Sequence, residues 1–264
     1  MLKIENIKKT FNKGEVTEKE VIKDLSMTIK DGDFITVIGG NGAGKSTLLN
    51  LIAGSLSLDS GKIILDGRDI SALKEYERAA FISRVFQDPL SGTCPDLTLA
   101  ENLSLAKRRG KRHTLKKGIT RQEKAEYREL LASLGLDLEG RLDDKVGVLS
   151  GGKRQAFTVV MATLVTPKLL LLDEATAALD PKTSKVVLEL IEKIVEHNHI
   201  TTFMITHDMQ DALDHGDRLI MMDEGDIILD IAKEEKAKMS INDLLIHFEK
   251  ASGHRLKSDS LLLS

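Results

Sequence analysis

The loop Gly39–Thr47 constrains the fold of this chain more than any other stretch. It reads Gly-Gly-Asn-Gly-Ala-Gly-Lys-Ser-Thr and matches the pattern G-x-x-x-x-G-K-[ST]. The β-branched run Phe34–Ile38 precedes it, and Ser46–Ala53 has helical character and is followed by Gly54. The sequence therefore predicts a strand, a glycine loop and a helix in direct succession, which is the context that this pattern requires.

Such a loop is typical of a phosphate-binding site. Its backbone N–H groups and the start of the next helix can surround polyphosphate oxygens, because glycine has no Cβ in the way. Lys45 would then reach the β- and γ-phosphates, and Ser46 would bind Mg²⁺. The alternative is a glycine-rich turn that carries a lysine by accident. The strand and helix that flank the loop favour phosphate binding.

Two acidic residues follow the apolar run Leu169–Leu172. They stand at the end of an expected buried strand, where one acid can order magnesium and the next can act on water. We assign Asp173 to the metal and Glu174 to catalysis as the candidate base. Alone, two such acids could merely cap the next helix. Their combination with the phosphate loop favours the catalytic interpretation.

Strand and helix patterns alternate along the rest of the chain. Strands of an edge sheet are expected at Leu2–Ile7, Val21–Ile29 and Gly61–Gly67. From about Thr98 to Thr163 helical patterns such as Ala125–Leu134 replace them. Further along, we expect strands at 168–173, 201–206 and 218–222, a helix at 182–197, and a tail helix that begins at Ser240 with Asp243 three positions later.

Length and composition set limits on the function. A chain of 264 residues with 41% hydrophobic residues can form one compact α/β domain with an added lobe. Its formal charge of −3 argues against a protein that coats nucleic acid, which needs a basic surface. The single cysteine, Cys94, and the lack of a secretory signal at the start indicate the reducing cytosol. The longest apolar runs are shorter than the roughly 18 residues that cross a bilayer, so a transport pathway would belong to another protein.

The segment Leu149–Gln155 reads Leu-Ser-Gly-Gly-Lys-Arg-Gln. It resembles the signature motif of ATP-binding cassette (ABC) ATPases and precedes the Asp173 strand by one helix, as in that family. Further matches, in family order, are the aromatic position that stacks on adenine, the Q-loop, the D-loop and the switch histidine, at Phe11, Gln87, Ala177–Asp180 and His207. Each has an ordinary interpretation by itself: Phe11 as a core residue, Gln87 as a surface amide and His207 as a strand-end histidine.

The resemblance covers roughly residues 1 to 230 and implies an α/β fold. We expect a P-loop NTPase core of ABC ATPase type, with an antiparallel β edge subdomain and an inserted α-helical lobe that carries the signature. Residues 1–264 would form a single ABC ATPase domain. Its parts would be the core with its β subdomain at 1–86 and 166–230, the helical lobe at 87–165, and a C-terminal helix and tail at 231–264.

The resemblance also implies a site for ATP and Mg²⁺ between two copies of the chain paired head to tail. The catalytic residues would be Glu174, His207 and Gln87, and the metal residues Ser46, Gln87 and Asp173. The residues that bind ATP would be Phe11, Gly39, Asn41, Gly42, Ala43, Gly44, Lys45, Ser46 and Thr47, with Ser150, Gly151, Gly152 and Asp180 at the partner's nucleotide. The D-loop departs from the family pattern, because Ala177 stands where serine is usual.

By this resemblance the chain is the ATP-hydrolysing subunit of a bacterial ABC transporter at the cytoplasmic face of the membrane. Its partners would be a second copy, a separate transmembrane permease and, indirectly, an extracellular substrate-binding lipoprotein, with no nucleic acid. Details within Val85–Asn102 and Asp173–Asp180 resemble an uptake branch associated with tryptophan or related aromatic amino acids. An exporter, a lipoprotein-handling complex and a regulatory ABC ATPase without a transport role stay open as alternatives.

The segment Lys107–Gly118 is strongly basic, with seven Lys or Arg residues and no acid in twelve positions. Self-repulsion predicts an exposed, solvated loop. A second interpretation places the segment near the anionic inner leaflet, where polybasic segments are attracted. The second interpretation predicts that serine at Lys107, Arg108, Arg109, Lys111 and Arg112 leaves the ATPase activity of the isolated subunit nearly unchanged but lowers transport by the full complex in anionic liposomes.

Overall fold

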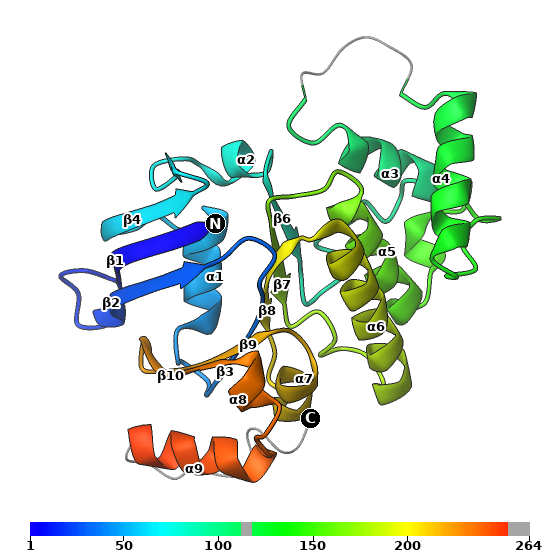
Figure 1. Cartoon of the computed structure of the whole chain (residues 1–264). Coiled ribbons are helices and arrows are strands. Elements are labelled where there is room, and N and C mark those ends of the chain that lie inside the picture. The colour runs from blue at the N-terminus through cyan, green and yellow to red at the C-terminus, as the bar shows by residue number, and fades with distance from the viewer. Residues whose placement is uncertain (112–117, 253–264) are drawn as a thin grey trace.

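The computed structural model describes residues 1–111 and 118–252 and contains two β-sheets (Figure 1). The first is antiparallel, with its strands in the order β2 (Lys19–Ile29), β1 (Leu2–Phe11), β4 (Ser60–Leu65) and β5 (Arg68–Asp69). The second has the order β10 (Asp226–Ala232), β9 (Arg218–Asp223), β3 (Phe34–Gly39), β8 (Thr201–Ile205), β7 (Leu169–Asp173) and β6 (Ile82–Val85). Its strands are parallel except β10. The expected α/β fold and edge sheet are confirmed.

Helix α1 (Lys45–Ala53) follows the phosphate loop and lies between the two sheets. Its apolar residues share one buried cluster with side chains of β1, β2, β3 and β7. The four leucines of β7 divide between two cores: Leu169 and Leu171 join this cluster, whereas Leu170 and Leu172 join the cluster on the opposite face. A continuous apolar run of this kind is expected for a parallel strand that is covered on both faces.

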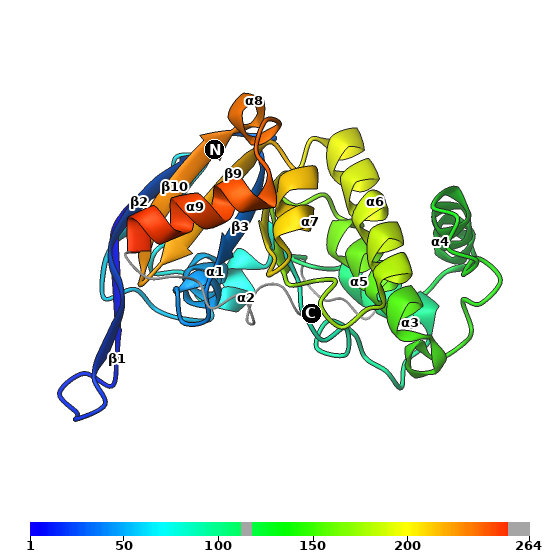
Figure 2. The ribbon, with the colours of Figure 1, turned by 90° about the horizontal axis from the view of Figure 1, so that it is seen from below.

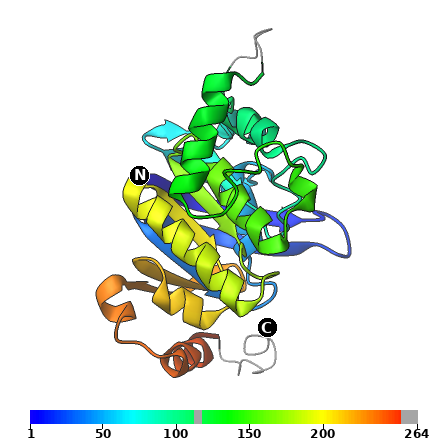
Figure 3. The same ribbon diagram turned by 90° about the vertical axis from the view of Figure 1, so that its right-hand side faces the viewer.

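The opposite face of the large sheet is covered by helices (Figure 3). The insertion between β6 and β7 contains α3 (Leu99–Lys107), α4 (Arg121–Ser133), the short 3₁₀ turn Val146–Val148 and α5 (Gly151–Thr163). Helix α6 (Pro181–Asn198) packs beside α5. Capping boxes start both α3 and α4, through Thr98 with Glu101 and Thr120 with Glu123. The helices expected between residues 98 and 163 are therefore confirmed.

The C-terminal part packs against the β9–β10 end of the large sheet (Figure 2). Its helices are α7 (Met209–Asp214), α8 (Lys233–Lys236) and α9 (Ile241–Ser252), which lies beside β10. Ser240 and Asp243 exchange the two hydrogen bonds of a capping box, which confirms the predicted start of the tail helix.

Several short elements were not expected from the sequence. They are β5, β6, α7, β10 and α8, together with α2 (Glu75–Arg78) beside the antiparallel sheet. β6 has only four residues and contains Ser83 and Arg84, so no apolar pattern marks it. Within the two described ranges, no helix is both long enough and apolar enough to span a membrane.

Candidate active site

The glycine loop between β3 and α1 borders a cavity of about 280 Å³. Seven residues of the loop and of the first turn of α1 line the cavity, with two residues of β2 and one acid after β7: Asn41, Gly42, Ala43, Gly44, Lys45, Ser46, Thr47, Lys19, Val21 and Glu174. Of the predicted nucleotide residues, the structure thus brings the loop residues from Asn41 to Thr47 together with Glu174. The position at the carboxyl ends of parallel strands is the usual one for ligands in open α/β sheets.

Glycine is required at two loop positions for different reasons. Gly39 has φ +151°, and a Cβ there would lie 2.2 Å from the carbonyl oxygen of Met222. Gly44 has φ +97° and precedes the first residue of α1, so its backbone is in a region that L side chains avoid. The loop can therefore bring its N–H groups and the start of α1 toward the cavity.

Lys45 is 8% exposed and points back over the loop. Its Nζ donates to the carbonyl oxygens of Gly39 at 2.7 Å and of Gly40 at 3.2 Å. Burial lowers the pKa of the amino group, and the nearby carboxylates of Glu174 and Asp173 oppose that shift. The ammonium group is therefore fixed where the loop closes, with two carboxylates near it.

The two acids at the end of β7 have different surroundings. Glu174 adopts φ +47°, and its N–H donates to the carbonyl oxygen of Ile205 at 3.0 Å. Its Oε2 lies 3.6 Å from Nδ1 of His207. This contact lowers the pKa of Glu174 and raises that of His207, although burial opposes both shifts. The pair favours an ionised glutamate beside a protonated histidine.

Asp173 contacts a residue that the sequence analysis did not single out. Nη2 of Arg84 donates to Oδ2 of Asp173 at 2.5 Å, and Nη1 donates to Oδ1 of Asn50 in α1 at 2.7 Å. Arg84 belongs to β6, and no motif marks it. Only the register of β6 against β7 places the guanidinium beside the carboxylate.

Other predicted residues also lie outside the cavity lining. Gln87 follows β6 and is exposed. Phe11 is half-buried at the end of β1, paired with Lys19, which does line the cavity. Ser150 is exposed and precedes α5, and Asp180 accepts a hydrogen bond from the N–H of Thr183 at the start of α6. Their roles at a nucleotide stay predictions.

The signature glycines also border α6. A Cβ on Gly152 would lie 2.0 Å from Cγ2 of Thr183, and a Cβ on Gly151 would be 3.9 Å from Leu179. Glycine at 152 thus lets α5 start close to α6. Helix α5 has thirteen residues, Gly151–Thr163. As in any helix, the N–H groups of its first turn have no acceptor within the helix and are therefore available to a ligand.

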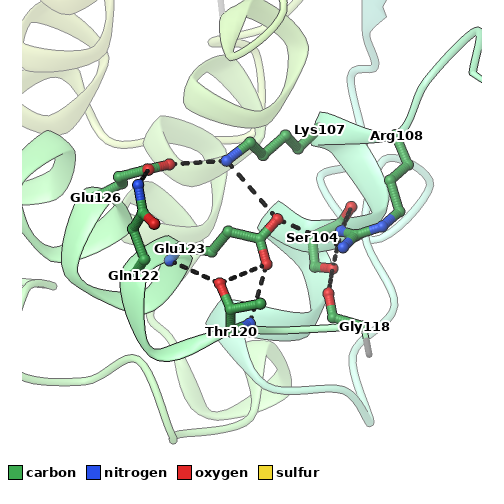
Figure 4. Close-up of polar contacts among 8 residues, drawn as sticks. All are labelled: Ser104, Lys107, Arg108, Gly118, Thr120, Gln122, Glu123 and Glu126. Atoms are coloured by element: carbon green, nitrogen blue, oxygen red, sulfur yellow. Dashed lines mark hydrogen bonds and ion pairs between the residues drawn. The ribbon is translucent and has the colours of Figure 1, made fainter. Parts of the chain in front are cut away.

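The start of the basic segment Lys107–Gly118 is anchored rather than free (Figure 4). Nζ of Lys107 lies 2.7 Å from Oε2 of Glu126, and Arg108 donates to the carbonyl oxygen of Ser104 at 2.8 Å and lies 3.4 Å from Oε1 of Glu123. The same Glu123 caps α4 through Thr120. These acids on α4 compensate the cations at the end of α3.

Arg109 extends the anchoring to the large sheet. Its guanidinium donates to the hydroxyl of Ser83 in β6 and to the carbonyl oxygens of Ala162 and Val165 at the end of α5. Burial lowers its pKa. The expectation of an exposed loop is therefore wrong for Lys107, Arg108 and Arg109, because each has acceptors, whereas Lys111 is exposed as expected. Residues 112–117 lie outside the described residues.

Together, the parallel sheet, the glycine loop with its lysine and the acids after β7 define a P-loop nucleoside triphosphatase. Comparison with known proteins identifies the family. The family model described as ABC transporter matches residues 22–177, more than half of the chain. The chain therefore belongs to the ABC transporter family and is an ATPase of the ATP-binding cassette type.

Two curated relatives illustrate the similarity. A tyrosine transport ATP-binding protein of Clostridioides difficile (strain R20291) is 48% identical over 251 residues, which cover 95% of this chain and 100% of that protein. The spermidine/putrescine import ATP-binding protein PotA of Haemophilus ducreyi (strain 35000HP / ATCC 700724) is 34% identical over 230 residues, or 87% of this chain and 57% of PotA. The chain thus matches the whole of the first relative but little more than half of the second.

Solved structures of ATP-binding cassettes have the same fold. The ADP conformation of MJ1267, a cassette of an ABC transporter, has a TM-score of 0.77 and 27% identity, and the match covers 96% of this chain and 97% of that one. The dimeric post-hydrolysis state of MJ0796 with ADP and Pi has a TM-score of 0.75 and 29% identity, with coverage of 88% and 99%. The expected fold, a P-loop core with an antiparallel edge sheet and an inserted helical part, is confirmed.

Proposed function

We propose that this chain is the ATP-hydrolysing subunit of a bacterial importer for an aromatic amino acid such as tyrosine or tryptophan. One observation supports the substrate class most directly: the full-length match, at 48% identity, to a protein named for tyrosine transport. The chain would act at the cytoplasmic face of the membrane with a separate permease and, indirectly, an extracellular substrate-binding lipoprotein. Its division into a core (1–86 and 166–230), a lobe (87–165) and a tail (231–264) belongs to the same proposal.

Hydrolysis would consist of positioning and charge stabilisation without a covalent intermediate. The loop N–H groups and Lys45 bind the β- and γ-phosphates. Glu174, with its lowered pKa, is ionised near neutral pH, orients a water molecule toward the γ-phosphorus and accepts its proton. The new P–O bond forms as the bond to the β-phosphate oxygen breaks, and ADP leaves. His207, with its raised pKa, orients Glu174 and faces the γ-phosphate.

Mg²⁺ fits the oxygen donors at this site. Asp173 offers a carboxylate and Ser46 an exposed hydroxyl on the first turn of α1, and Gln87 would add an amide oxygen. Mg²⁺ usually combines one or two protein ligands with substrate phosphates and water. Among residues 1–111 and 118–252, no group of three His, Cys, Asp or Glu residues could hold a metal by itself. A bound Mg²⁺ would neutralise charge on the phosphate oxygens.

The second half of each ATP site would come from another copy of the chain. Ser150, Gly151, Gly152 and Asp180 do not line the phosphate cavity of their own chain. Ser150 and Gly151 are exposed, and the start of α5 is suited to bind an anion. The match to the dimeric cassette MJ0796 supports a head-to-tail pair with ATP between the copies. ATP would stabilise the closed pair, and hydrolysis would release it.

Replacing Glu174 by glutamine tests the hydrolytic role. The variant keeps the shape of the side chain and removes its basicity, so we expect turnover to fall by about 10²–10⁴-fold while ATP binding is retained. Gel filtration with ATP should then show a trapped dimer. Glu189→Gln, at an exposed position on α6, is the matched control. Near-normal turnover without additional dimer would refute the assignment of Glu174.

Uptake measurements test the substrate class separately. The chain, co-expressed and purified with its permease, is placed in liposomes with an aromatic amino-acid-binding lipoprotein, and uptake of labelled tyrosine, tryptophan and phenylalanine is measured with and without ATP. We expect ATP-dependent uptake of at least one of them. If none is transported although Glu174→Gln behaves as expected, the ATPase assignment stands and the importer assignment fails.

A further inference from the structure

Arg84 and Asp173 lie on the same face of neighbouring strands. Arg84 pairs with Leu171 in the parallel register of β6 and β7, and Asp173 follows two residues later. Because side chains alternate along a strand, Leu171 and Asp173 point to the same side. That side faces α1, whose Asn50 also contacts Arg84. Strand register thus brings a cation to the carboxylate assigned to the metal.

The guanidinium of Arg84 has a fixed position. It is bonded to Asp173 and Asn50 and lies 4.6 Å from the centre of the Phe86 ring. The side chains of Arg84 and Asp173 are only 15% and 16% exposed. Nε of Arg84 is buried without a hydrogen-bond partner among the described residues. Its desolvation is unfavourable, whereas in a surface ion pair the same N–H would donate to water. Stability alone gives little reason for such a pair, since buried ion pairs often contribute little to it.

We propose that Arg84 is a positioning residue that holds Oδ2 of Asp173 and serves as its counter-cation while no metal is bound, and thereby sets how strongly nucleotide affinity depends on Mg²⁺. The inference rests on the proposed role of Asp173 toward Mg²⁺. Only Oδ2 is engaged by Arg84; within the described residues, Oδ1 accepts no hydrogen bond.

The charges around the loop explain the expected direction. Asp173 and Glu174 place two negative charges where phosphates must bind, and Arg84 and Lys45 offset them. Without Arg84, an uncompensated Asp173 repels a metal-free nucleotide. Mg²⁺ neutralises the same carboxylate, so the loss of Arg84 matters less once the metal is present. Removing a neighbouring positive charge also favours the metal itself.

The test is the affinity for a fluorescent ADP analogue, measured in EDTA and again in saturating Mg²⁺. In Arg84→Met we expect the affinity in EDTA to fall about tenfold and the affinity in Mg²⁺ to change far less. The ratio of the Kd in EDTA to the Kd in Mg²⁺ should therefore rise about tenfold. Binding of Mn²⁺ to the complex with the analogue, followed by electron paramagnetic resonance, should become tighter. Neither readout depends on turnover.

Three comparisons make the result decisive. Arg84→Lys keeps the charge and should stay close to wild type, whereas Arg84→Gln keeps hydrogen-bonding capacity without the charge and should show the raised ratio. Arg68→Met is the matched control, because Arg68 also lies over a phenylalanine ring, 5.6 Å from Phe81, but in the antiparallel sheet. Circular dichroism and Tm establish that each variant is folded.

An unchanged ratio in folded Arg84→Met, or in Arg84→Gln if the methionine variant does not fold, would overturn the proposal. A lowered ratio would overturn it too, because Arg84 would then help Asp173 to bind the metal. If wild-type affinity does not respond to Mg²⁺ at all, the proposed Mg²⁺ site itself fails. The two failures are therefore distinguishable.

Discussion

Replacing Arg109 by methionine removes a guanidinium that joins the α3–α4 connection to β6 and to the end of α5. Three acceptors lose a donor: the hydroxyl of Ser83 and the carbonyl oxygens of Ala162 and Val165. A hydrogen bond from a charged donor contributes about 1.5–3 kcal/mol. Because one partly exposed side chain makes all three and such effects are not additive, we expect a total loss of about 2–4 kcal/mol.

For a chain of this size, that loss corresponds to a decrease in Tm of about 10 °C. Thermal unfolding of the nucleotide-free subunit, followed by circular dichroism and repeated in urea, measures it. Lys111→Met is the control, since Lys111 is an exposed cation two residues along the same segment. A decrease of less than about 2 °C for Arg109→Met would refute the reasoning from these contacts. The expectation that serine at these cations leaves the ATPase activity of the isolated subunit nearly unchanged concerns turnover and is tested separately from this loss of stability.

Two further results are expected. Lys45→Ala should weaken ATP binding and abolish turnover, whereas Ser150→Arg should leave ATP binding to the monomer intact and block the pair. Mixing the two variants should restore one hybrid site, and no ATPase activity in the mixture would contradict head-to-tail pairing. The contact between Glu174 and His207 should stabilise the fold most between about pH 4.3 and pH 6.5, the ordinary pKa values of the two groups. Its contribution is lost as the pH falls through the lowered pKa of Glu174 or rises through the raised pKa of His207. The Tm difference between wild type and His207→Gln, measured from well below to well above this range, should therefore be largest within it and shrink on both sides, and a pH-independent difference would contradict the ion pair.

The sequence predicted those parts of the fold that depend on local patterns. The phosphate loop, the strand before it and the helix after it are specified by consecutive residues, and the four leucines of β7 identify a buried strand. The antiparallel strand β10, by contrast, was not predicted. It forms a hairpin with β9, and its hydrogen-bonding partner is recognised only once the two strands are paired. The sequence did contain a signal for α7, because Asp208 is a residue type preferred at helix N-caps. In the structure its carboxylate accepts hydrogen bonds from the N–H groups of Gln210 and Asp211.

The candidate site was predictable where a motif carries it and not where strand register does. Lys45 and Glu174 line one cavity, as their motifs suggest. Arg84 becomes visible only when β6 is paired with β7, because 89 positions separate it from Asp173 along the chain. Arg109 was misjudged for a related reason: a run of cations suggests mutual repulsion, but the acceptors that compensate Arg109 lie in β6 and at the end of α5.

The left-handed backbone of Glu174 has a consequence for the evolution and engineering of this chain. Non-glycine residues avoid φ values such as its +47°, so the carboxylate is held at a local conformational cost. Glycine or asparagine at this position would relieve that cost and remove the base at the same time. Stability and activity are therefore opposed at one residue. Above the raised pKa of His207, where its contact with Glu174 no longer contributes to stability, a library selected for heat resistance alone would drift toward inactive cassettes.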